Sequence, residues 1–178
     1  MKKYILLVLL LIAYFSGRAQ LTFDASKLND SILAICNQMV ADSIVRGEHY
    51  NVFPLTTEQW KLYKQLQIIA TDSMFVELTN LPSYIIRWYA FEHLFHRSSP
   101  YLFDALKKNE NDTIIGVYQK GCIPYMAPLI DYIISDMYRY YRKKKNKHLL
   151  SKEDFKYINS TKGFLAKSYS KERGKRVG

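Results

Sequence analysis

The fold of this chain is decided by the stretch 81–108, which reads LPSYIIRWYAFEHLFHRSSPYLFDALKK. Pro82 ends the preceding element, and Ser83 can cap a helix that begins after it. Apolar and aromatic side chains then cover much of the circumference of this helix. They are Ile85, Ile86, Trp88, Tyr89, Phe91, Leu94 and Phe95. A helix that is apolar on most sides is buried between its neighbours, so we expect 83–96 to be the central helix of the fold.

A second helix is predicted after a tight turn at Arg97, Ser98 and Ser99. Ser99 is the predicted cap, and Pro100 follows it at the first helical position, where a helix tolerates the missing N–H. The apolar face of this second helix carries Leu102, Phe103 and Leu106. The two segments together predict a helical hairpin.

Three segments of this region, 82–91, 101–106 and 111–113, resemble a HEAT-like repeat unit. In such a unit a helix that carries an arginine and an alanine packs on a second helix that ends near an aspartate, here Asp112. The region is similar to small exported bacterial HEAT-like proteins with no assigned activity. The resemblance covers about 81–122, and it implies stacked hairpins that present an extended binding surface.

The chain departs from a regular repeat array in two ways. No clear second copy recurs at a fixed period, although solenoids usually need three or more repeats. The segment 114–118 is β-branched and broken by Gly116, which favours a strand or an extended loop, and Pro124 and Pro128 predict a connection. We therefore expect an all-α fold, a short and irregular stack of helical hairpins.

Apolar residues recur at three- and four-residue spacing in other segments, which predicts further helices. These segments are 26–46, 56–71, 73–79, 127–142 and 151–158. Thr56, Asp72 and Ser151 are the predicted caps, the last with Asp154 in the capping-box position. The predicted domain organisation is a leader over 1–19, a helical domain over 20–147 and a basic extension over 148–178.

Residues 1–19 are predicted to be a secretory signal peptide. Two lysines precede an apolar run over 4–15, which is shorter than the roughly 20 residues that cross a bilayer. Gly17 and Ala19 put small side chains where a signal peptidase reads the chain. We expect cleavage after Ala19 and a mature chain in the periplasm or outside the cell, with an uncleaved anchor as the alternative.

The charge of the mature chain is uneven. Residues 20–138 carry 9 basic and 13 acidic side chains, a net charge of −4, whereas 139–178 carry 14 basic and 3 acidic, a net charge of +11. In an exported protein such a basic end favours contact with anionic lipid or polysaccharide over nucleic acid. A solvated end without a partner is the alternative.

Three tyrosines at positions 138, 140 and 141 come directly before the basic residues that begin at Arg142. This order suits the boundary between the apolar and anionic layers of a membrane surface. Lysines at helix C-termini are also common for reasons of the helix dipole. With two residues of the central helix, the predicted binding residues are Arg87, Trp88, Tyr140, Tyr141, Arg142, Lys143, Lys144 and Lys145. We expect a protein or peptide partner in the envelope and no nucleic acid.

Candidate catalytic residues are few. Glu92, His93 and His96 share one helical turn, but their order differs from the His-Glu-x-x-His of zinc proteases and from its inverse. We predict no catalytic residue, no metal and no cofactor, and an interaction or scaffold module of the envelope. The alternative is an envelope hydrolase that acts on polysaccharide or peptide, with a site built from Glu92, His93 and Asp112.

Two further features concern modification. Cys36 and Cys122 form an even pair, which in an exported chain permits one disulfide; a buried free thiol at Cys36 is the alternative. Four tripeptides also resemble the Asp-Ser/Thr-apolar acceptor site of an O-glycosylation system of exported proteins in some bacteria. They are Asp30-Ser31-Ile32, Asp42-Ser43-Ile44, Asp72-Ser73-Met74 and Asp112-Thr113-Ile114. Helix capping accounts easily for Asp72 and Asp112, whereas Asp42, in the middle of the predicted helix 26–46, is explained by neither interpretation.

Overall fold

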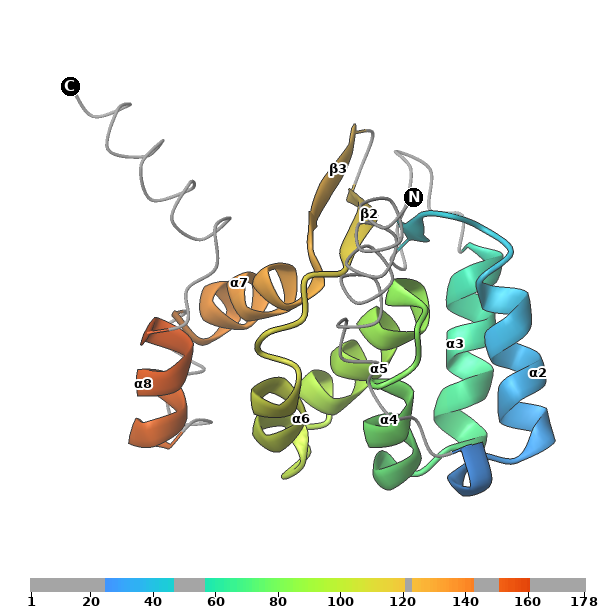
Figure 1. Ribbon diagram of the computed structural model, residues 1–178, viewed down its shortest axis with the longest axis horizontal. Helices are drawn as coiled ribbons and strands as arrows, with labels where there is room; N and C mark the ends of the chain where they lie inside the picture. The colour runs from blue at the N-terminus through green and yellow to red at the C-terminus, as the bar shows by residue number, and fades with distance from the viewer. Residues whose placement is uncertain (1–24, 47–56, 121–122, 143–150, 161–178) are drawn as a thin grey trace, which may run out of the picture.

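The computed structural model describes residues 25–46, 57–120, 123–142 and 151–160 (Figure 1). The predicted leader, most of the basic extension and Cys122 lie outside these residues. The described elements are η1 (Ala25–Lys27), α2 (Asp30–Met39), β1 (Val45–Arg46), α3 (Glu58–Ile69), α4 (Asp72–Leu78), α5 (Tyr84–His96), α6 (Leu102–Lys108), β2 (Ile115–Lys120), β3 (Ile123–Pro128), α7 (Leu129–Arg142) and α8 (Lys152–Ser160).

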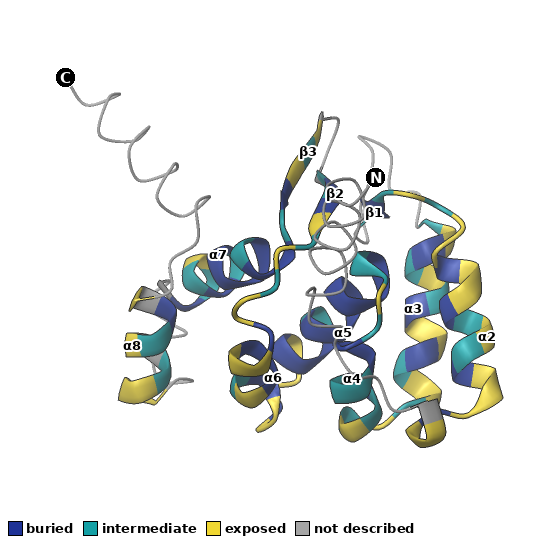
Figure 2. Ribbon diagram, viewed as in Figure 1, coloured by how far each residue is buried: buried dark blue, intermediate teal, exposed yellow. Residues whose placement is uncertain are grey.

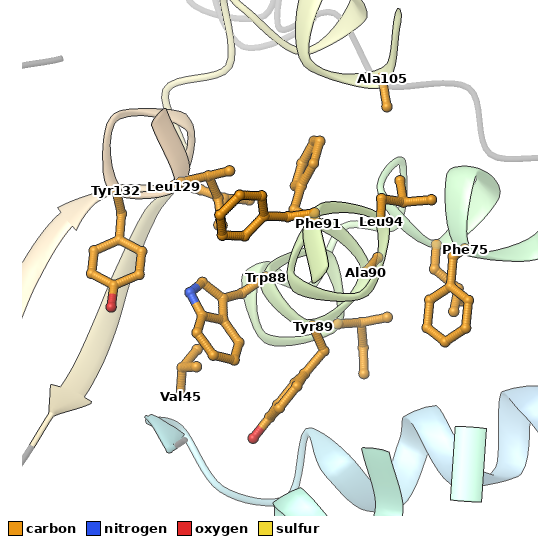
Figure 3. Packing of buried hydrophobic residues seen from close by; sticks show 14 of the residues in the cluster. Val45, Phe75, Trp88, Tyr89, Ala90, Phe91, Leu94, Ala105, Leu129 and Tyr132 are labelled. Atoms are coloured by element: carbon orange, nitrogen blue, oxygen red, sulfur yellow. The ribbon is translucent and has the colours of Figure 1, made fainter. Parts of the chain in front are cut away.

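The central position expected for 83–96 is confirmed by α5. Ten of its thirteen residues are buried, and it packs against α2, α4, α6, α7 and β2. Figure 2 shows buried residues along most of α5, whereas α2 and α6 expose their outer sides. In Figure 3 the side chains of α5 spread toward Val45 of β1, Phe75 of α4, and Leu129 and Tyr132 of α7.

A small sheet corrects the all-α expectation. The described residues are mostly helical, but β1, β2 and β3 form a sheet in that order. β1 pairs parallel with β2, with Val45 opposite Tyr118, and β2 pairs antiparallel with β3, with Tyr118 opposite Tyr125. The strand predicted from the composition of 114–118 is therefore confirmed by β2. The connection predicted around Pro124 is wrong, because these residues form β3.

The predicted helix over 26–46 is too long, because its last residues join the sheet. α2 ends at Met39, and Val45 and Arg46 pair with β2. An ion pair between Asp42 and Arg46 spans the bend between helix and strand. The helical spacing of apolar residues thus continues beyond the end of α2 at Met39, although the backbone at Val45 and Arg46 pairs with β2 and no longer forms a helix.

The helix caps lie one residue from two of the predicted positions. Thr57, not Thr56, accepts a hydrogen bond from the Trp60 N–H at 3.1 Å. Thr71, not Asp72, caps α4 by accepting from the Met74 N–H. The predicted Ser151 cap is confirmed, since its hydroxyl accepts from the Asp154 N–H at 3.0 Å.

Directly after the C-cap of α5, Ser98 adopts the left-handed backbone conformation. Ser98 has a φ of 50°, the Ser98 N–H donates to Phe95 O, and the Ser99 N–H donates to Leu94 O. These two bonds form a Schellman motif, in which glycine is the usual left-handed residue. Ser99 is not the cap of α6 as predicted, because α6 begins only at Leu102 after Tyr101.

Candidate functional site

Arg87, a predicted binding residue, is buried inside the protein. Its Nη2 donates a hydrogen bond to Asn109 Oδ1 at 2.8 Å and lies 2.5 Å from Asp112 Oδ2. Asn109 in turn donates to Ala105 O, and Asp112 Oδ1 accepts from the Ile114 N–H. The Arg87 cluster therefore joins the start of α5 to the end of α6 and to the entrance of β2.

Trp88 is also buried, with 6% of its surface exposed. Its ring lies 4.8 Å from that of Tyr89 and 6.4 Å from that of Tyr132. Figure 3 shows the Trp88 ring between the side chains of Tyr89 and Tyr132. A ligand on the protein surface does not reach residues buried to this extent. The burial of Arg87 and Trp88 therefore argues against the direct binding role predicted for them and assigns them to the core.

The aromatic residues predicted for membrane contact pack against the end of α5. Tyr141 is buried and its ring lies 5.7 Å from that of Phe95; Tyr140 is half-buried, 5.1 Å from the same ring. Tyr141 is thus a core residue at the C-terminal end of α7, not part of an exposed aromatic platform. The side chain of Arg142 and the whole of Lys143, Lys144 and Lys145 lie outside the described residues.

The three residues of the enzyme alternative belong to three separate contacts. Glu92 pairs with His96 at 2.9 Å, His93 lies 3.2 Å from Asp72, and Asp112 contacts Arg87. The described contacts therefore do not unite Glu92, His93 and Asp112 into one reaction centre. Within the described segments, no group of three or more His, Cys, Asp or Glu side chains is placed to hold a metal ion.

The buried His93 ring is held on three sides. It stacks on Phe75, with ring centroids 3.6 Å apart, its Nε2 lies 3.2 Å from Asp72 Oδ1, and its Nδ1 lies 3.5 Å from Gln67 Nε2. Burial lowers the pKa of His93, although Asp72 opposes this shift. The nearby Ser99 hydroxyl, followed by His93, lowers the pKa of the Asp72 carboxyl. The arrangement thus favours a neutral imidazole beside an ionised carboxylate.

A buried glutamine holds the connection between α2 and β1 against α3. Gln59 Nε2 donates to the carbonyls of Met39 and Ile44, and Gln59 Oε1 accepts from the Arg46 N–H at 2.9 Å. The Tyr89 hydroxyl lies 2.9 Å from the same Oε1. The sequence shows only that Gln59 lies near the start of a helix, and that position gives no sign that its side chain would meet backbone groups of the segment 39–46.

One face of the β2–β3 hairpin is mostly apolar and partly exposed, and we call it the outer face. It comprises Ile115, Val117 and Gln119 of β2 with Pro124, Met126 and Pro128 of β3. Ile115 is 56% exposed and Met126 69% exposed, and the register makes them diagonal neighbours across the two strands. The opposite face carries Tyr118 and Ala127, which are buried against the helices.

Both prolines of β3 occupy positions that face away from β2. The Leu129 N–H donates to Ile114 O at 2.9 Å, and the regular register then directs the backbone groups of Ala127 and Tyr125 toward β2. Pro124 and Pro128 alternate with these residues, so the free edge of β3 lacks two of its N–H donors. Such prolines keep an edge strand from pairing with another chain.

Cys36 is a buried cysteine on α2, with 4% of its surface exposed and no disulfide partner among the described residues. Burial raises the pKa of its thiol to about 12. The pairing with Cys122 stays a prediction, because Cys122 lies outside the described residues. The buried site supports the alternative in which Cys36 serves as a small core residue.

In the part of the chain that the structure describes, every helix is too short or too polar to cross a bilayer. Comparison of the chain with known protein families, curated proteins and solved structures finds no match.

Proposed function

We propose that the protein is an exported interaction module of the bacterial envelope and that it binds a protein partner through the outer face of the β2–β3 hairpin. The observation that carries this proposal is the exposure of Ile115 and Met126 as diagonal neighbours on that face. Clustered apolar side chains at the surface of a small domain commonly mark sites of interaction.

The outer face rests on a rigid support. On the opposite side of the hairpin, the ring of Tyr118 stacks on that of Tyr132 from α7, with centroids 4.5 Å apart and planes 6° apart. Gly116 packs so closely that an added Cβ would lie 2.6 Å from the Tyr118 hydroxyl. A preformed surface loses little conformational freedom when a partner binds, which favours affinity.

The two prolines at the outer edge of β3 disfavour a partner that binds by adding a strand to the sheet. A peptide that adds a strand to a sheet needs the backbone donors of the edge, and Pro124 and Pro128 remove two of them. The partner therefore contacts the side chains of the outer face rather than extending the sheet. The basic extension predicted beyond α7 would hold the module at an anionic surface of the envelope.

A site-specific photo-crosslinker tests the binding face. We expect a crosslinker at Met126 to give a discrete adduct in cells of the native host, and the charged substitution Ile115→Glu to abolish that adduct. Ile68 is 84% exposed and belongs to α3, not to the hairpin, so it serves as the control position. Equal labelling at Met126 and Ile68, or no adduct at Met126, would overturn the proposal.

Two further measurements test export and tethering. Fractionation is expected to place the chain in the envelope without residues 1–19. A truncation after Lys162 is expected to reduce association with the envelope, and the association of the full chain is expected to weaken as salt rises. A chain found in the cytosol with its leader intact would contradict export, and unchanged salt-dependent association after truncation would contradict tethering by the extreme end.

A further inference from the structure

The Asp-Ser/Thr-apolar tripeptides are more frequent than composition alone predicts. Ser and Thr together account for 20 of 178 residues, so a chance arrangement would place a hydroxyl after about one of the nine aspartates. Four of the nine aspartates are followed by Ser or Thr, and in all four cases the next residue is apolar. The repetition therefore needs an explanation that the proposed binding face does not supply.

The structure places all four hydroxyl side chains at the surface. Ser31, Ser43, Ser73 and Thr113 are each exposed. Exposure is not automatic in this protein, because Thr79, Ser99 and Ser135 are buried. A bulky hydrophilic group attached to any of the four would extend into solvent without displacing the core.

The apolar third residue anchors each tripeptide. Ile32 is completely buried, and Ile44, Met74 and Ile114 are half-buried. The apolar residue of each tripeptide thus packs against the protein, while the residue that carries the hydroxyl is exposed. The Ser73 hydroxyl also lies 2.9 Å from that of Thr71. Four segments from different parts of the fold therefore present the same combination of anchored apolar residue and exposed hydroxyl.

Helix capping does not account for the pattern. Asn29 caps α2 and Thr71 caps α4, so the aspartates at 30 and 72 occupy the first helical position in both helices and the serines occupy the second. The caps are supplied by residues outside the tripeptides. Asp30 and Asp72 still interact favourably with the helix dipole, but that effect does not require a serine to follow.

The four aspartates differ in exposure, and this difference predicts how readily each tripeptide would be recognised by a modifying enzyme. Asp30 is exposed, the side chains of Asp42 and Asp72 are 34% and 32% exposed, and that of Asp112 is 12% exposed and paired with Arg87. An enzyme that reads the carboxylate of the folded chain reaches Asp30 most easily and Asp112 least. Ser31 is therefore the strongest site of the four and Thr113 the weakest.

We propose that Ser31, Ser43, Ser73 and Thr113 are O-glycosylation sites of the exported chain. In each case the hydroxyl oxygen attacks the anomeric carbon of a sugar carried on a phosphate leaving group. The new bond joins the hydroxyl oxygen to the anomeric carbon, the bond between that carbon and the phosphate oxygen breaks, the hydroxyl proton passes to a base of the transferase, and the phosphate departs with the electron pair. The inference rests on the export assumed in the proposed function.

The intact mass of the full-length gene product, purified from its native host, tests the proposal. We expect a mass above that of chain 20–178 by several increments of one constant size. Single Ser→Ala substitutions at 31, 43 and 73 are each expected to remove one increment, and the combined change with Thr113→Ala to remove all of them. Ser160→Ala is the control, because Ser160 is exposed but follows Asn159, and it is expected to leave the mass increments unchanged.

The variant Asp30→Ala tests whether modification requires the whole tripeptide or only an exposed serine. It keeps Ser31 but removes the carboxylate, so we expect the increment at Ser31 to disappear. Retention of that increment would overturn the recognition of the tripeptide. A mass equal to that of the unmodified chain 20–178 would overturn the modification but leave export standing. The unmodified mass of chain 1–178, found in the cytosolic fraction, would overturn export as well.

Discussion

The Arg87 guanidinium lies 2.5 Å from the Asp112 carboxylate while only 2% of the Arg87 side chain is exposed. The pair thereby links α5 to the loop before β2 inside the protein. Removal of one residue would leave the other charge buried without its partner. The resulting loss in the free energy of unfolding is larger than the net contribution of the intact pair to stability.

Asp112→Ala is therefore expected to lower the free energy of unfolding by about 3–5 kcal/mol, the usual cost of breaking a buried ion pair from one side. The double variant Arg87→Met/Asp112→Leu is expected to recover part of that loss. Urea unfolding measures both. Glu58→Ala, in an exposed pair with Lys61, is the control and is expected to cost less than about 1 kcal/mol; an equally small effect at Asp112 would contradict the structural role.

Ser98→Gly is expected to stabilise the protein by roughly 0.5–1 kcal/mol, because glycine adopts the left-handed conformation without the steric penalty of a Cβ. Thermal unfolding would show this as a rise in Tm. Ser98→Ala keeps the Cβ and is expected to give no such rise. A lower Tm for the glycine variant would mean that the Ser98 side chain contributes more than its conformation costs.

His93 and His96 are expected to change stability with pH in opposite directions. The folded-state pKa of His93 lies below 6.5, so the unfolded chain takes up the proton more readily and stability falls as the pH drops below 6.5. The folded-state pKa of His96 is raised, chiefly by Glu92, so its contribution is present below pH 6.5 and is lost as the pH rises through the raised value.

Urea unfolding between pH 5 and pH 8 separates the two histidines. His93→Gln is expected to remove the loss of stability toward low pH, and His96→Gln to remove the loss toward high pH. The same pH dependence in wild type and His93→Gln would show that another group is responsible.

Gly116→Ala is expected to cost about 1–3 kcal/mol, as overpacking of a filled site does. Its Cβ would lie 2.6 Å from both Tyr118 Oη and Tyr84 Cδ2, and Tyr118 cannot move aside easily because it stacks on Tyr132. Adding Tyr118→Phe removes the nearest oxygen and is expected to restore part of the stability. Chemical denaturation of the single and double variants measures the difference, and a neutral Gly116→Ala would contradict the close packing.

Replacement of Pro124 and Pro128 by threonine is expected to promote self-association, because it restores two N–H donors on the free edge of β3. Analytical ultracentrifugation over a range of concentrations detects the change. Met126→Thr is the matched control, since it alters the outer face but leaves the number of edge donors unchanged. Self-association of the control but not of the proline variant would place the contact on the face instead of the edge.

The sequence by itself determined the helices and the identity of the central one. The apolar residues of α5 surround its axis, so its burial follows from composition and periodicity, which are local properties. The amphipathic spacing of α3, α7 and α8 predicted their positions for the same reason. The β-branched composition of 114–118 also indicated where a strand would lie.

Only the tertiary structure decided the sheet and the partners of the polar residues. Val45 pairs with Tyr118, 73 positions away in the sequence, and no local pattern encodes so distant a backbone partner. For the same reason Arg87 was predicted to bind a ligand, whereas the chain itself supplies Asp112 and Asn109 to it in the interior. Periodicity specifies which side of a helix is buried, but the groups that meet that side are specified by how distant segments pack.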